Sequence, residues 1–268
     1  MESGKMVSGT LGMIGCPILE DEMAHVITSD PEVSEVVFVD TEDSSNLIRK
    51  VRGSVKDIRF IKEEDLGSFR SDDGLTLLIW MKSAGLHEEP DDLREEVLRS
   101  MDLMSRACDS LLLFYGLCGN AFKDIDELSS RFRTPVFILR DSQGQVVDDC
   151  IAAPLGGTEG YLALLRRYTG VFYLTPAWAE NWRDMMGKME LFKGVDDVDI
   201  GTMKRLFDMA DYSKVLKIDT GLGDRETFHR KSREFAEIFD FEEHTLEDGY
   251  CSLEVVEDSY SRAKRCLS

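Results

Sequence analysis

The sequence predicts an α/β fold, a mostly parallel, doubly wound sheet with helices on both faces. Two observations carry this prediction. Short runs such as Leu111 to Phe114 are apolar throughout, without the polar alternation of a half-exposed strand. A segment with helical spacing of apolar residues follows most of these runs. Because no proline-rich or glycine/serine-rich linker divides the chain, we expect a single domain over residues 1–268, with possible interleaved lobes at 1–150 and 151–268.

The elements of the first half alternate between strand and helix. The apolar run 10–14 ends at Gly15-Cys16-Pro17, and Pro17 suits the first turn of the helix that follows, where a missing N–H is no loss. The amphipathic spacing of residues 89–107 predicts a long helix. In order, we predict strand 10–14, helix 18–27, strand 36–39, a helix around 47–51, strands 57–61 and 75–80, helix 89–107, strand 111–114, a further helix, and strand 136–139.

The second half repeats the pattern with fewer elements. We predict a helix at 161–168, a strand at 171–174, a strand at 216–219 and a helix at 226–239. The stretch after Glu242, which contains Cys251 and Cys266, yields no prediction.

The composition narrows the classes of function. The chain carries 32 Lys and Arg against 52 Asp and Glu, a formal net charge of -20. This charge repels nucleic acids and anionic membrane surfaces, so neither is an expected partner. The sequence shows neither an export signal near Met1 nor an apolar run long enough to span a membrane, so we expect a cytoplasmic protein. In that compartment six cysteines indicate thiols, metal ligands or small buried apolar residues rather than disulfides.

Three cysteines follow predicted strands. Cys16 comes directly after strand 10–14, Cys118 follows strand 111–114 across a glycine turn, and Cys150 lies in the loop after strand 136–139. Since ligands bind beyond the carboxyl ends of parallel strands, these three are candidate metal ligands. Thiolates suit zinc or an iron–sulfur cluster, and three of them leave one coordination position open. The separations, 118 − 16 = 102 and 150 − 118 = 32 residues, form no C-x-x-C motif, and each cysteine could equally be a small buried apolar residue.

Polar residues beside these cysteines are candidates for catalysis. Glu20 stands four residues after Cys16 and could be a fourth ligand or a general base, or could compensate the dipole at a helix N-terminus. Tyr115 and Asn120 flank Cys118 and could donate hydrogen bonds to a substrate, although Tyr115 could equally serve packing. Gly116 and Gly119 of the same turn are the candidates for binding a cofactor.

Five strings stand in order along the chain: Gly15 to Glu22, Tyr115 to Asn120, Asp149 to Ile151, Tyr173 to Trp178 and Ile218 to Leu222. Together they resemble one known family, the uncharacterised family called domain of unknown function 1638. That family is common in methanogenic archaea and some anaerobic bacteria and is often encoded near corrinoid-dependent methyltransferases. It usually has a histidine two residues before the third cysteine, where this chain has Asp148.

The resemblance implies a place in anaerobic one-carbon metabolism. We expect a metal- or cluster-dependent enzyme or enzyme subunit that uses the three cysteines, with zinc or an iron–sulfur cluster undecided, a small-molecule substrate, and a corrinoid protein or methyltransferase as partner. Two alternatives remain open. One is a non-catalytic accessory protein that docks on such a partner through its acidic surface. The other is a thiol enzyme with Cys118 as a lone nucleophile or redox group.

Overall fold

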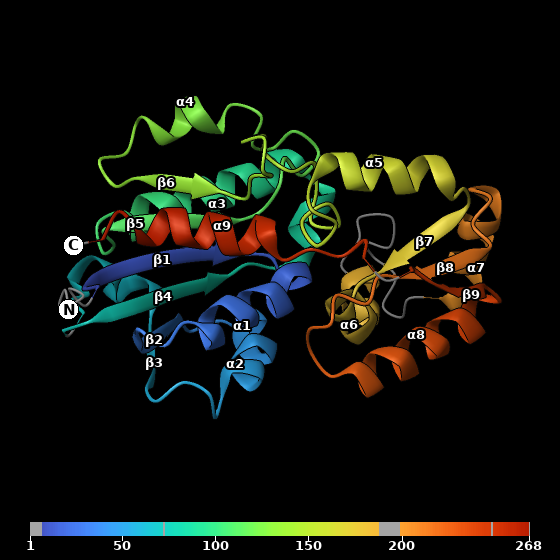
Figure 1. Ribbon diagram of the computed structural model, residues 1–268, viewed down its shortest axis with the longest axis horizontal. Coiled ribbons are helices and arrows are strands. Elements are labelled where there is room, and N and C mark those ends of the chain that lie inside the picture. The colour runs from blue at the N-terminus through green and yellow to red at the C-terminus, as the bar shows by residue number, and fades with distance from the viewer. Residues whose placement is uncertain (1–6, 72, 188–198, 248, 268) are drawn as a thin grey trace.

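The computed structural model describes residues 7–71, 73–187, 199–247 and 249–267, and its largest feature is a six-stranded parallel sheet (Figure 1). The strands run in the order β3-β2-β4-β1-β5-β6. The central strand β1 pairs with β4 on one side and β5 on the other, so that Gly12 lies opposite both Leu78 and Leu111. The strands are β1 (Gly9–Gly15), β2 (Val33–Val39), β3 (Ile58–Ile61), β4 (Leu75–Met81), β5 (Ser110–Phe114) and β6 (Val136–Ile138).

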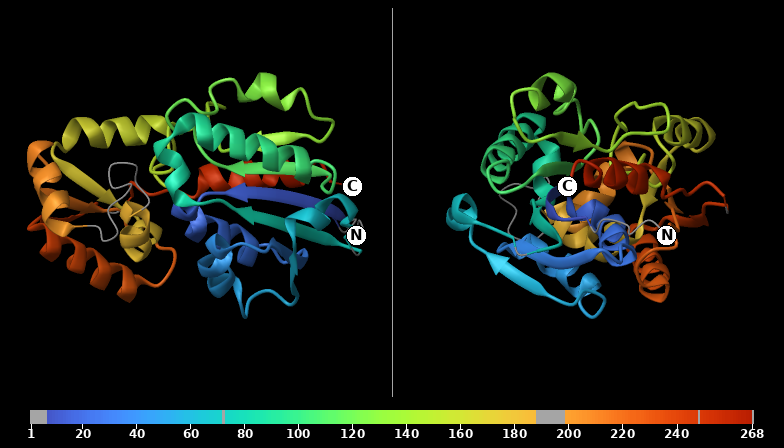
Figure 2. Two further views of the ribbon diagram at one scale, coloured as in Figure 1. Left: turned by 180° about the vertical axis from the view of Figure 1, so that it is seen from behind. Right: turned by 60° about the vertical axis from the view of Figure 1, so that its left-hand side comes forward.

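Helices cover both faces of this sheet. The helix α9 (Glu254–Lys264) contacts β5, β6 and α1 (Glu20–Ser29), and α1 contacts α2 (Ser45–Val51). On the opposite face lies α3 (Pro90–Met104), which contacts β1, and α4 (Ile125–Ser129) contacts the edge strand β6 (Figures 1 and 2). With every residue of β4 and β5 buried, the apolar runs of the sequence are explained by coverage on both sides, and the predicted α/β fold is confirmed.

A smaller lobe follows, built on the three-stranded parallel sheet β7-β8-β9. Its core is aromatic: the ring centroids of Phe235 and Phe239 lie 4.7 Å apart, and Phe172 lies 5.0 Å from Phe235. After this lobe the chain returns to the first sheet, so residues 254–264 pack on β5 and β6. The elements are α5 (Thr158–Arg167), β7 (Val171–Leu174), α6 (Pro176–Gly187), α7 (Ile200–Met209), β8 (Lys214–Lys217), α8 (Arg225–Phe239) and β9 (Glu242–Thr245).

The carboxyl ends of the two sheets face each other. In Figure 1, β1 runs from the end of the molecule that carries both termini toward the smaller lobe, and β7 runs back toward β1. The helix α6, which follows β7, contacts the short 3-10 turn Pro17–Leu19, which follows β1. In the same way a Cβ atom on Gly223, after β8, would lie 2.8 Å from Asp21 at the start of α1. The contact between the lobes is therefore the region in which an open α/β sheet places its ligands.

Most predicted elements recur in the structure, and the differences have physical causes. The strand predicted at 216–219 begins and ends two residues earlier in the structure, as β8 (Lys214–Lys217). Lysines stand at both ends of this strand, so the apolar pattern does not reveal its bounds. Lys217 is nevertheless buried, because its ammonium group pairs with Glu243 at 2.9 Å. The sequence analysis also missed α6, α7, β9 and α9. In the part of the chain that is described, no helix combines the length and apolar character that a membrane span requires.

Candidate functional site

The three predicted cysteines lie together at the carboxyl edge of the large sheet. Cys16 directly follows β1, Cys118 follows β5 and Cys150 follows β6, and all three are buried free thiols. The Cys150 thiol is in hydrogen-bond contact with Cys118 and with Cys16; these contacts, together with burial, raise its pKa well above the usual range. Three strand ends thus deliver three thiols to one place. Within the described ranges, however, no group of three or more His, Cys, Asp or Glu side chains is arranged so that it could hold a metal ion as it stands.

The turn that carries Cys118 has an unusual backbone. Cys118, Gly119 and Asn120 have φ values of 45°, 64° and 71°, a run of left-handed residues of which only one is glycine. Such conformations cost free energy in L-residues and persist only where the surroundings enforce them. Here the backbone N–H groups of Leu117 and Cys118 donate to the carbonyl oxygens of residues 147 and 148, at 2.8 and 3.1 Å. The turn is therefore fixed against the loop that leads to Cys150.

The two glycines proposed for cofactor binding lie at close backbone approaches. A Cβ atom on Gly116 would lie 2.5 Å from the carbonyl oxygen of Val147, and one on Gly119 would lie 3.0 Å from the ring of Pro90. A side chain at position 116 would push the turn away from the loop before Cys150. Gly116 thereby permits the contact between the two cysteine-bearing segments.

Tyr115 is the predicted catalytic residue that the structure places beside the thiols. Its side chain is buried and packs on Phe122, with ring centroids 5.6 Å apart. Burial raises the pKa of its hydroxyl well above the usual range, and the nearby cysteines 16, 118 and 150 and the carboxylate of Asp43 raise it further. The phenol is therefore protonated at neutral pH and can act as a hydrogen-bond donor. Asn120, in contrast, is exposed to solvent.

Glu20 is completely buried and faces the smaller lobe. Its Oε1 atom accepts hydrogen bonds from the ammonium group of Lys50 at 2.9 Å and from the amide of Asn181 in α6 at 3.0 Å. Burial raises its pKa, and Lys50 opposes that shift. The carboxylate predicted as a fourth ligand or general base thus has its observed partners between the lobes.

In the loop before Cys150, Asp148 stands at the position where the family resemblance leads us to expect a histidine. The side chain of Asp148 is exposed, and its backbone carbonyl is the acceptor for Cys118. The neighbouring Asp149 instead folds the loop, because its Oδ1 atom accepts from the backbone N–H groups of residues 151 and 152 at 2.8 and 2.9 Å. Burial raises the pKa of Asp149, and the hydroxyl of Tyr161 in the smaller lobe donates to its carboxylate.

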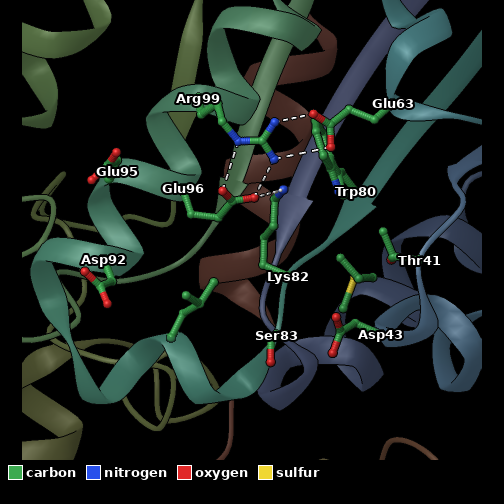
Figure 3. A pocket seen from close by; sticks show the side chains of 12 residues that line it. Thr41, Asp43, Glu63, Trp80, Lys82, Ser83, Asp92, Glu95, Glu96 and Arg99 are labelled. Carbon is green, nitrogen blue, oxygen red and sulfur yellow. Dashed lines mark hydrogen bonds and ion pairs between the residues drawn. The ribbon is translucent and has the colours of Figure 1, made fainter.

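A cavity of about 490 Å³ opens at the carboxyl ends of β2 and β4 (Figure 3). Asp43, whose charge acts on the buried Tyr115, lies on its wall and so relates the cavity to the thiol cluster. On the opposite wall Glu96 bonds both Lys82, at 2.9 Å, and Arg99, at 2.8 Å, and Arg99 reaches on to Glu63. The Arg99 contact, followed by that of Lys82, lowers the pKa of Glu96 to about 2.

Lys82 is a candidate that the sequence analysis missed. It follows β4 directly, its backbone N–H donates to Gly15 at 2.9 Å, and its side chain is only 4% exposed. Its ammonium nitrogen lies 3.3 Å from the centroid of the Trp80 ring. Burial lowers its pKa to about 8, so an appreciable fraction of the amine is neutral near physiological pH. The rule that singled out the cysteines, a polar group just after an apolar strand, would also have found Lys82.

Comparisons with known proteins identify a family for this chain. No curated protein matches the sequence. Among solved structures, the signal recognition particle receptor FtsY from Elizabethkingia anophelis, in complex with GDP, is 14% identical over 52% of this chain and 50% of that chain, with a TM-score of 0.30. The chain spans about half the length of that receptor. A family model described as "Protein of unknown function (DUF1638)" matches residues 80–256, which include Cys118, Cys150 and the whole smaller lobe. The chain belongs to this family.

Proposed function

We propose that Cys16, Cys118 and Cys150 bind a single zinc ion and that the protein is a zinc-dependent enzyme. The observation that supports this proposal is the contact of the Cys150 thiol with the other two thiols, which come from distant parts of the sequence. Sulfur is a soft, polarisable donor and zinc prefers it. Binding displaces the thiol protons, so the hydrogen-bonded thiols are the protonated form of the proposed site and ligate after a small rearrangement.

The mutual contact of the thiols favours one ion over an iron–sulfur cluster. A tetrahedral zinc with Zn–S bonds of about 2.3 Å gathers its sulfur ligands around one point, so thiols in mutual contact suit a single ion. A cluster inserts several iron atoms between its cysteine ligands and requires them to lie further apart. Among the two cofactors that the sequence left undecided, we therefore favour zinc.

Three protein ligands leave room for a substrate group. Zinc with an open position lowers the pKa of a bound thiol or water and polarises a substrate. Tyr115, buried beside the three thiols, would be available as a hydrogen-bond donor to a group bound there, and Lys82, in the cavity at the end of β4, would give or accept a proton near neutral pH. On the basis of the family resemblance we propose transfer of a one-carbon group, with a small molecule as substrate and a corrinoid protein or methyltransferase as partner.

Metal analysis of anaerobically purified protein tests this proposal. We expect one equivalent of zinc per chain in the wild type and its loss when Cys16, Cys118 or Cys150 is replaced by serine. Cys108→Ser is the matched control, because Cys108 is also a buried free thiol but lies after α3, apart from the cluster. Zinc content should be unchanged in that variant.

Each other outcome points to one of the alternatives. Iron with equimolar sulfide, in place of zinc, would indicate an iron–sulfur cluster. A protein without zinc or iron that forms a stable complex with a corrinoid protein would be an accessory protein. Rapid alkylation of Cys118 alone, in a metal-free protein, would indicate a thiol nucleophile. A triple serine variant that keeps its metal would refute the proposed ligands.

A further inference from the structure

A second and larger cavity, about 900 Å³, lies between the two lobes. Its walls come from α1 and α2 of the large lobe and from α6, the loop after β8 and the first turns of α8 in the smaller lobe. Cavities of this size and at this place, between lobes whose strand ends face each other, are typical of sites for small molecules. It lies apart from the cavity beside Lys82, with which it shares no lining residue.

The floor of this cleft has fewer hydrogen-bond donors than its carboxylates need. Lys50 is shared by three carboxylates: Glu20 at 2.9 Å, Asp21 at 2.6 Å and Glu180 of the smaller lobe at 3.2 Å. Asn181 also donates to Glu20, and Arg49 also pairs with Glu180. The Oε2 atom of Glu20 and the Oδ2 atom of Asp21 are both buried and have no hydrogen-bond partner among the residues that the structure describes. A buried acceptor without a donor costs free energy, and native proteins rarely keep one without a reason. Asp21 lines the cavity, and its Oδ2 atom therefore lacks a donor, whereas Oδ1 accepts from Lys50.

A short glycine-containing loop covers this carboxylate. A Cβ atom on Gly223 would lie 2.8 Å from Oδ1 of Asp21, so only glycine permits the observed approach. Gly223 itself is exposed and has a left-handed φ of 69°. Asp21 and Gly223 both line the cavity, while the pairing of Asp21 with Lys50 stays inside the large lobe.

The rim of the cleft carries the opposite charge. Arg49, from α2, and Arg230 and Lys231, from α8, line the cavity together with Lys50, against the acidic residues Asp21, Glu180 and Asp224. Four basic groups and three acidic ones make this lining net positive, although the whole chain has a formal charge of -20. The Arg230 side chain is exposed and free to approach an anionic group. The cleft thus offers an unsatisfied acceptor at its floor and guanidinium groups at its rim.

We propose that the cleft binds a small zwitterion of the α-amino acid class. Its protonated amine would donate to Asp21, and its carboxylate would pair with Arg230 and Lys231. A ligand with only one of these charges satisfies only one side of the site. Since both lobes supply contacts, binding stabilises the contact between the lobes and with it the folded protein.

A thermal-shift screen of the full-length protein tests this inference. The probes are the twenty common L-amino acids at 10 mM, with 1,4-diaminobutane and succinate as the amine-only and carboxylate-only comparisons. At least one amino acid should raise the melting temperature, and neither comparison compound should. For that amino acid, calorimetric titration should show at least 10-fold weaker binding to Asp21→Asn and to Arg230→Gln.

Arg233→Gln is the matched control, because Arg233 is exposed on the same helix but does not line the cleft. It should bind as the wild type does. The inference is overturned if no amino acid binds, if 1,4-diaminobutane or succinate binds equally well, or if Asp21→Asn and Arg230→Gln leave the affinity unchanged. Because Arg230 is exposed, its variant tests the site even if Asp21→Asn fails to fold. Zinc content should be normal in Arg230→Gln, which separates this test from that of the three-cysteine site.

Discussion

The backbone N–H of Cys118 donates a hydrogen bond to the carbonyl oxygen of Asp148 at 3.1 Å, and this bond joins the turn after β5 to the loop that carries Cys150. Leu117 forms a parallel bond to Val147 at 2.8 Å. Two cysteines 32 residues apart, 150 − 118, are thereby held side by side without a short motif. The third, Cys16, joins them because β1 is the immediate neighbour of β5 in the sheet.

Replacement of Gly116 by alanine should separate the two segments. Its Cβ atom would lie 2.5 Å from the backbone oxygen of Val147, which cannot move away as a flexible side chain could. We expect a loss of about 1–3 kcal/mol in the free energy of unfolding, measured by denaturant titration, together with weaker zinc binding. Gly67→Ala is the control, since a Cβ there meets no atom within 4 Å. Equal stability of the Gly116 variant and the wild type would show that the loops tolerate separation.

Variants of Asn120 should distinguish a conformational role from a catalytic one. The residue is exposed and left-handed, with a φ of 71°, a conformation that glycine adopts freely and alanine adopts at a cost. We expect Asn120→Gly to keep the stability and zinc content of the wild type. Asn120→Ala should lose about 1 kcal/mol in chemical denaturation. Full stability with loss of zinc or activity in the glycine variant would instead assign the amide a direct role.

Buried Glu22 should make the stability depend on pH. Burial, followed by the nearby Asp21, raises its pKa from 4.5 to about 8, so the folded protein holds a proton that the unfolded chain has released. Its contribution is fully present below pH 4.5 and is lost as the pH rises through 8. Glu22→Gln should remove this slope and stabilise the protein at pH 8 by roughly 2–4 kcal/mol. Urea titrations between pH 5 and 8 measure the free energy of unfolding, with the exposed Glu159→Gln as control. The same dependence of this free energy on pH in the wild type and in Glu22→Gln would contradict the prediction.

The amine of Lys82 should titrate near pH 8 in the folded protein. NMR of ¹³C-labelled lysine measures its midpoint, and Lys82→Met identifies the signal by its loss. Because the Glu96 contact raises the lowered pKa, Glu96→Gln should move the midpoint further down. Between pH 8 and the ordinary value of 10.5 the unfolded chain retains the proton, so the stability contributed by this group rises with pH in that window. A midpoint near 10.5 in the wild type would contradict the burial of this charge.

The sequence by itself determined the α/β class and the positions of the strands of the large sheet. Strands such as β5 are buried on both faces, so their local sequence is apolar without interruption and reveals them directly. Cys16 and Cys118 could be placed at carboxyl ends for the same reason, since each stands next to such a strand. The helix α9 could not be found in this way, because its sequence mixes polar and apolar residues. It packs against β5 and β6, which lie far earlier in the chain, and the local sequence does not show this packing.

Only the tertiary structure decided which polar groups meet. Glu20 lies four residues from Cys16, yet its carboxylate pairs with Lys50 and with Asn181, which is 161 residues away. The facing of two sheets, which depends on long-range packing between lobes, brings these side chains together and creates the cleft at Asp21. Sequence spacing carries local geometry, whereas the burial of a charge and the choice of its partner depend on every element that packs around it.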